Sequence, residues 1–273
     1  MFQQVKPKST VHTAVSILEL IYHATVREVR KGHGNALMAL ALNILQAVVF
    51  IAAFYVMFSL LGLRGAALRG DFLLYIMSGI FLFLTHIKTL SSVFGSEGPS
   101  SPMMQHAPMN TAIAIMAAGL SALYIQVLTL VLILFVYHVA FTPFEIEYPF
   151  AAFGMFLLAW LTGFALGLVL LAVKPWFPTF TSTFATVYQR ANMIASGKMF
   201  VANALPSYML AMFDWNPLFH CIDQARGFVF VNYAPRNSSV EYPLYVALIF
   251  IVIGLMGEFY TRRHASTSWE ARR

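Results

Sequence analysis

The chain has 273 residues, of which 59% are hydrophobic and 10% are charged. Soluble domains carry about 25% charged residues, so this composition excludes an ordinary soluble domain and indicates an integral membrane protein. The net charge of +6 is better explained by anchoring at an anionic membrane surface than by binding to nucleic acid. The single cysteine, Cys221, excludes an internal disulfide and a cysteine-based metal cluster.

The first predicted element is an amphipathic helix over residues 14–31. Apolar residues recur at steps of three and four from Val15 to Val29, whereas polar residues from Glu19 to Lys31 recur at steps of four on another face. This helix is too polar to cross a membrane, so we expect it to lie along the cytoplasmic membrane surface. A solvated helix packed on a partner is the alternative.

Six membrane spans follow, because six segments are long and apolar enough to cross the hydrocarbon layer. They are 36–61, 72–94, 111–138, 149–173, 179–203 and 243–260. The second and fifth are less hydrophobic, which favours helices that face a pathway rather than lipid. Lys and Arg are more frequent on the side of the two termini, which predicts that both termini lie in the cytoplasm. The six spans together predict a single all-α domain.

The connection over 95–110 is cytoplasmic in this layout and holds three prolines. Met103 and Met104 lie between Pro102 and Pro108. Exposed methionines in a short segment bounded by prolines suit the docking of a partner protein, because the flexible thioether side chain adapts to irregular surfaces. A plain loop is the alternative interpretation.

The segment 196–233 between the last two predicted spans is aromatic and apolar, yet it carries several charges and is interrupted by Pro206 and Pro217. A charge or an unsatisfied backbone group that faces lipid is costly. A solvated loop, in contrast, would not hold so many large apolar side chains. We therefore expect broken helix at the membrane surface or re-entering the membrane.

Arg190 lies near mid-depth of the fifth predicted span. Arginine is not neutralised at ordinary pH, so its side chain must meet water, an acid or carbonyl groups. Arg190 either faces a pathway, where it would attract an anionic substrate, or holds a dimer or bundle together. If the span instead begins nearer Arg190, this residue is interfacial.

Four further residues are candidates for a substrate path. Phe54 and Phe58 share a helix face at spacing four, with Tyr55 beside them, and aromatic rings can stack on the apolar faces of sugar rings. Lipid contact and interfacial belts are the alternative for such residues. Lys88 lies near the cytoplasmic end of the second span, where its long side chain can also extend to the membrane surface.

The sequence holds no Walker-type phosphate loop and no HExxH motif. A phosphate loop needs clustered backbone N–H groups and a Ser or Thr hydroxyl for Mg²⁺. If ATP drives this protein, another chain therefore supplies the motor. We expect no metal site and no cofactor bound by this chain.

The stretch from Arg190 to Tyr233 resembles the permease subunits of ABC-2 type polysaccharide exporters, which export capsular polysaccharide and related glycans. The residues that carry the resemblance are Arg190, Ser196-Gly197, Leu205-Pro206, Trp215-Asn216-Pro217-Leu218, His220, Asp223, Arg226 and Tyr233. The six-span layout extends the similarity over nearly the whole chain. Lys198 departs from the mostly apolar continuation expected after Ser196-Gly197.

The resemblance implies an ABC-2 exporter fold in the bacterial inner membrane. It implies a homodimeric, non-enzymatic permease, paired with two copies of an ATPase subunit that binds ATP and Mg. The cargo would be a capsular or other lipid-linked, acidic polysaccharide, and a periplasm-spanning adaptor is a further conceivable partner. By the same resemblance 95–110 contact the ATPase, through Ser101, Pro102, Met103, Met104 and Gln105. Residues 204–233 would form an external gate that includes Trp215, Asn216, Pro217, His220, Asp223 and Arg226.

Other functions stay open at this point. An ABC-2 exporter of a drug or small lipid would share the layout and would lack glycan synthesis genes as neighbours. A polytopic membrane transferase would need paired acids at the cytoplasmic ends of spans, and we find no such pair in the sequence. A structural membrane scaffold would need neither Arg190 nor the broken segment.

If 95–110 dock an ATPase, replacing both Met103 and Met104 with Asp should block co-purification of that subunit, because two carboxylates would oppose an apolar contact. Insertion of the chain into the membrane should be unchanged. Affinity capture of the tagged chain from detergent extracts measures both. Undiminished recovery of the ATPase would count against this assignment.

Overall fold

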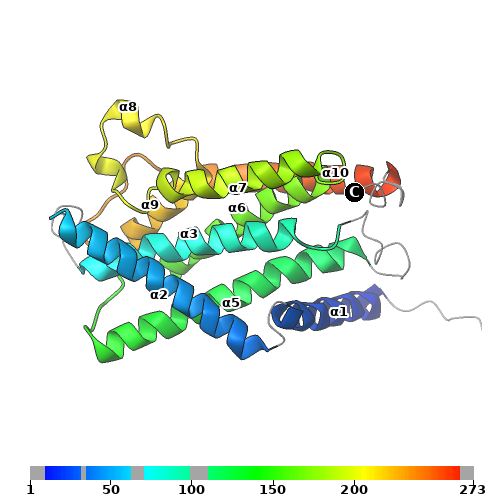
Figure 1. Ribbon diagram of the computed structural model, residues 1–273, viewed down its shortest axis with the longest axis horizontal. Helices are drawn as coiled ribbons and strands as arrows, with labels where there is room; N and C mark the ends of the chain where they lie inside the picture. The colour runs from blue at the N-terminus through cyan, green and yellow to red at the C-terminus, as the bar shows by residue number, and fades with distance from the viewer. Residues whose placement is uncertain (1–9, 32–34, 63–70, 99–109, 265–273) are drawn as a thin grey trace, which may run out of the picture.

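A computed structural model describes residues 10–31, 35–62, 71–98 and 110–264, and every regular element in these ranges is a helix (Figure 1). The long helices are α1 (Thr10–Lys31), α2 (Ala36–Leu60), α3 (Phe72–Phe94), α5 (Thr111–Ala140), α6 (Pro149–Val173), α7 (Pro178–Ala195) and α10 (Glu241–His264). Three short elements, η1 (Ala202–Ala204), α8 (Ser207–Leu210) and α9 (Pro217–Val229), lie between α7 and α10. The predicted docking residues 101–105 lie outside the described ranges.

Within the described ranges, α2, α3, α5, α6 and α10 are long and apolar enough to cross a membrane. Their positions agree with five of the six predicted spans. The predicted fifth span, 179–203, is wrong at its end, because α7 stops at Ala195 and Gly197 adopts a positive φ of 75°. The count of six spans is therefore not confirmed.

Helix α3 is the centre of the bundle and contacts α2, α5, α6, α7 and α9. Every residue from Leu74 to His86 is buried. The expectation that this second span faces a pathway is therefore wrong for most of its length. Its lower hydropathy reflects polar residues such as Ser78 and His86 that bond inside the protein rather than to solvent.

The two ends of the bundle differ (Figure 1). The C-terminal end of α3, the start of α5 and the end of α10 lie at one end together with α1, and α8 and α9 lie at the other. We call these the α1 end and the α9 end. Helix α1 packs on α5 and leaves Val15, Leu18 and Tyr22 more than half exposed. Its location along the membrane surface stays a prediction.

A buried amide network joins α2 to α5. The Asn43 amide donates to the Thr129 hydroxyl over 2.8 Å, and the Gln126 amide donates to the Asn43 carbonyl oxygen over 3.1 Å. All three side chains are less than 9% exposed. Hydrogen bonds between membrane helices contribute about 0.6–2 kcal/mol each, so this network helps to fix α2 against α5.

Helices α3 and α6 approach closely at Gly163. A Cβ atom on Gly163 would lie 2.4 Å from the carbonyl oxygen of His86, which is backbone and cannot move aside. Just beyond, Nδ1 of His86 lies 3.0 Å from the Thr162 hydroxyl, so a polar contact reinforces the same crossing. The missing side chain at Gly163 thus sets the distance between the two helices.

Gly163→Ala should destabilise the bundle by about 1–3 kcal/mol, because the added methyl group overpacks a backbone contact. Gly154→Ala is the matched control on the same helix, since a Cβ there meets nothing within 4 Å. Thermal unfolding of the purified protein in detergent measures both. Equal unfolding temperatures for Gly163→Ala and wild type would show that Gly163 does not set the distance between α3 and α6.

Candidate functional site

The candidate site is the buried polar cluster that surrounds α9. This helix enters the bundle against α6, α3 and α10. Leu218, Phe219 and Ile222 are at most 1% exposed, and the charged Asp223 and Arg226 are at most 2% exposed. A short helix that is mostly buried and still carries two buried charges requires specific partners for both of them.

Arg226 binds the chain segment that precedes α8. Its guanidinium donates from Nη1 to the carbonyl oxygens of Gly197 (2.9 Å) and Phe200 (2.6 Å) and from Nη2 to that of Lys198 (2.7 Å). The opposite contact is the ring of Tyr75 on α3, whose centroid lies 4.2 Å away. Three carbonyl dipoles and an aromatic face thus stabilise a cation that is 0% exposed.

Asp223 lies one helical turn before Arg226 and binds the segment that follows α9. Its carboxylate accepts hydrogen bonds from the Tyr233 hydroxyl and from the Ser238 hydroxyl (2.6 Å). Burial, with the hydrogen bond to Asp223, raises the pKa of Tyr233, so its hydroxyl stays protonated and donating. The two charges of α9 therefore attach it to the chain on both sides.

Asn216 and His220 fix the start of α9. The Asn216 carbonyl oxygen caps the helix by accepting from Leu218 N, while its amide donates to the Asn192 carbonyl oxygen on α7 (2.8 Å). Pro217 occupies the first turn, where no backbone donor is needed. His220 accepts from Ser239 N at Nδ1 (3.0 Å), so its Nε2 carries the proton donated to the Asp214 carbonyl oxygen (2.6 Å).

Two glycines permit the close packing of this cluster. A Cβ on Gly79 of α3 would lie 2.8 Å from Cβ of Lys198 and 3.0 Å from a guanidinium nitrogen of Arg226. Gly197 combines its left-handed φ with a position where a Cβ would meet the Phe219 ring at 2.6 Å. Any other residue at Gly197 would be strained by both its backbone conformation and its surroundings.

Lys198 is 3% exposed and lies in an aromatic cage. Its ammonium nitrogen lies 3.3 Å from the centroid of the Phe83 ring, 5.2 Å from that of Phe54 and 5.8 Å from that of Phe50. The nearest polar partner among the described residues is the Met193 sulfur at 3.4 Å. Burial lowers the pKa of Lys198 to about 7, so the ring quadrupoles offset only part of the cost of burying the ammonium. The cage links α2 and α3 to the loop after α7.

Arg190 is not part of this cluster. It lies on the outward face of α7, is exposed, and forms no ion pair with a described residue. It therefore does not hold the bundle of a single chain together. The inward face of α7 is attached by polar contacts, Tyr188 to His86 (2.9 Å) and Gln189 to Ser91 (3.1 Å).

The remaining predicted residues are spread over the molecule. Phe54 joins the Lys198 cage, whereas Tyr55 and Phe58 pack on the Phe72 ring near the α9 end of α2. Trp215 is 60% exposed just before α9. Lys88 lies toward the α1 end, in a different pocket. The structure therefore gathers the predicted gate residues other than the exposed Trp215 around α9, and it divides the predicted path residues among several places.

Sequence reasoning missed two residues of the cluster and one buried acid at the other end of the bundle. Tyr75 and Asn192 bind the cluster from α3 and α7, and neither stands out in the sequence, because each acts through a partner far along the chain. Glu258 is an acid inside the last helix, 8% exposed, and its carboxylate accepts from the Thr111 hydroxyl. Its presence in an otherwise apolar stretch was the signal for a buried polar contact between α10 and α5.

The comparisons with known proteins agree with a transport role. No family model matches the chain. The chain is 23% identical over 189 residues to the polysialic acid transport protein KpsM of Escherichia coli, an alignment that covers 68% of this chain and 71% of KpsM. Several membrane-length helices and this distant similarity together indicate a multi-pass membrane protein similar to a polysaccharide transporter.

Arg226→Lys should destabilise the segment around α9 by about 3 kcal/mol, because one ammonium cannot serve three carbonyl oxygens and the Tyr75 ring. Faster protease cleavage within 196–216 and a lower unfolding temperature would report the loss. Tyr75→Phe is the control, since it keeps the ring and removes only a hydroxyl that is buried without a partner among the described residues. Arg226→Lys with wild-type stability would refute the assigned role of the guanidinium.

Proposed function

We propose that this chain is the permease subunit of an ATP-driven exporter that moves a polysaccharide outward across the bacterial inner membrane. The similarity to KpsM carries the proposal, because it spans 68% of the chain and KpsM transports polysialic acid by its name. A separate ATPase subunit would hydrolyse ATP, since this sequence has no phosphate loop. The chain itself would perform no covalent chemistry.

The outward face of α7 supports a homodimer as the working form. Phe180 and Phe184 stack with ring centroids 6.1 Å apart and are 65% and 41% exposed, and Val187 and Ile194 are 58% and 62% exposed. These apolar residues share the face with exposed hydroxyl side chains, at Thr179, Ser182, Thr183 and Thr186. A face of this mixed character suits contact with a second copy and a hydrated path better than contact with lipid.

Arg190 lies on the same face and would project toward the space between the two copies. There it would meet water and a polyanion, which are the surroundings that a permanent cation needs at membrane depth. An acidic, lipid-linked polysaccharide fits this arrangement. Transport would follow from alternating access as the two copies move relative to each other.

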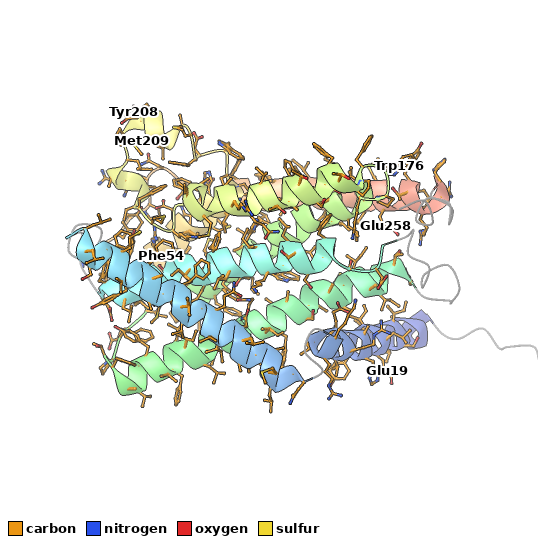
Figure 2. The ribbon with its side chains drawn as sticks, viewed as in Figure 1. Glu19, Phe54, Trp176, Tyr208, Met209 and Glu258 are labelled. Atoms are coloured by element: carbon orange, nitrogen blue, oxygen red, sulfur yellow. The ribbon has the colours of Figure 1, made fainter. Side chains whose placement is uncertain are left out.

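The α9 end would face the outside and the two termini the cytoplasm. Figure 2 shows Tyr208 and Met209 on α8, at the opposite end of the bundle from Trp176 and Glu258. Tyr208, Met212 and Trp215 are each at least 60% exposed, so α8 and its flanks offer an apolar surface at the proposed exit. This surface is where a gate, or an external adaptor protein, would make contact.

Arg190→Ala should lower polysaccharide export and uncouple ATP hydrolysis from it, while assembly with the ATPase is retained. Arg190→Lys should keep partial export, because a point charge still attracts the anion but loses the forked hydrogen bonds. The measurement is surface polysaccharide per assembled complex in cells that depend on a plasmid copy of this chain. Failure of the wild-type copy to restore export would refute the function, whereas normal export by Arg190→Ala would refute only the role of the arginine.

A further inference from the structure

A second site lies at the α1 end, far from the α9 cluster. Residues of α1, α2, α3 and α5 line a pocket that is open to the surface and has a cavity volume of about 480 Å³. Its polar lining includes Lys88, Ser91 and Ser92 of α3 and Gln126 of α5. Ser92 already donates to the Ala118 carbonyl oxygen (2.8 Å) and Gln126 to the Asn43 carbonyl oxygen (3.1 Å). The ammonium of Lys88 and the hydroxyl hydrogen of Ser91, whose oxygen accepts from Gln189, are therefore the donors left for a ligand in this cavity.

The charges in this pocket favour an anion. Lys88 is half-buried and forms no ion pair with a described residue. Lys31 and Glu28 also line the pocket, and they are paired with each other at 3.5 Å. Lys31 also pairs with Glu97 at 3.8 Å, just outside the lining. Lys88 is thus the lining cation that has no carboxylate partner among the described residues, and an anionic ligand would supply one.

The position of the pocket favours a lipid as the source of that anion. Lys88 is six residues before the end of α3, about 9 Å along the helix axis, and Ala39 and Asn43 lie in the first turns of α2. Next to them on α2, Leu42 and Leu45 are 41% and 57% exposed. An apolar surface thus begins where the polar pocket ends, as the headgroup and acyl chains of one lipid would require.

We propose that this pocket binds the phosphodiester of an anionic phospholipid from the leaflet at the α1 end, with Lys88 as its charged ligand. The Ser91 hydroxyl, whose oxygen accepts from Gln189, donates its hydrogen to the phosphate, and the acyl chains follow the exposed apolar face of α2. Bound there, the lipid connects α1 to three helices of the bundle. The inference rests on the membrane location of the chain and is independent of the exported cargo.

The test is lipid retention by the purified full-length chain, measured by native mass spectrometry with phosphatidylglycerol and phosphatidylcholine of identical acyl chains. Wild type should retain phosphatidylglycerol preferentially, and Lys88→Gln should reduce that preference about tenfold, the equivalent of about 1.4 kcal/mol. Lys88→Arg should keep most of it. Ala39→Phe, which fills the pocket and leaves the charge, should lose it as well.

Lys174→Gln is the matched control. Lys174 lies at the same end of the bundle, but its ammonium contacts the Phe94 carbonyl oxygen (3.4 Å) outside the pocket. Equal preference in wild type and Lys88→Gln, or an equal loss in Lys174→Gln, would overturn the proposal. Displacement of phosphatidylglycerol by millimolar inorganic phosphate would instead identify a site for free anions and would also overturn it. None of these measurements involves transport, so they are separable from failure of the exporter function.

Discussion

The bonds from Arg226 to three backbone carbonyl oxygens are the interaction on which the rest of this structure depends. They hold the loop after α7 in its non-helical course, and that loop places Lys198 in its aromatic cage. Because an arginine guanidinium stays charged, its burial is costly unless hydrogen-bond acceptors surround it. Arg226 and Asp223 make α9 a rigid insertion that is attached to both of its flanking segments.

Helix α7 contrasts with this rigid insertion. Its inward face is joined to α3 by a few polar contacts, and its outward face is exposed over its whole length. A helix with little buried apolar surface can shift at a lower energetic cost than α3, which is buried from Leu74 to His86. The fold thus combines a buried central helix with one helix whose outward face is exposed.

Much of the helix layout could be predicted from the sequence, because apolar runs of membrane length are a strong local signal. The bounds of α2, α3 and α6 agree with the predicted spans to within a residue. The error at the end of α7 has both a local and a nonlocal cause. Gly197 at positive φ ends the helix locally, although apolar residues resume at Met199. The carbonyl oxygens of Gly197, Lys198 and Phe200 then bind Arg226, which lies nearly thirty positions later, instead of continuing the helix.

The sequence by itself determined that the chain is a helical membrane protein and that the segment before the last helix holds the unusual charges. Only the tertiary structure decided what those charges do. Asp223 and Arg226 are buried and bind the flanking loops, whereas Arg190 is exposed. Lys198 contacts aromatic rings rather than an acid. The physical reason is that hydrophobic periodicity is local, whereas the partner of a buried charge is set by which distant segments the packing brings within hydrogen-bonding distance.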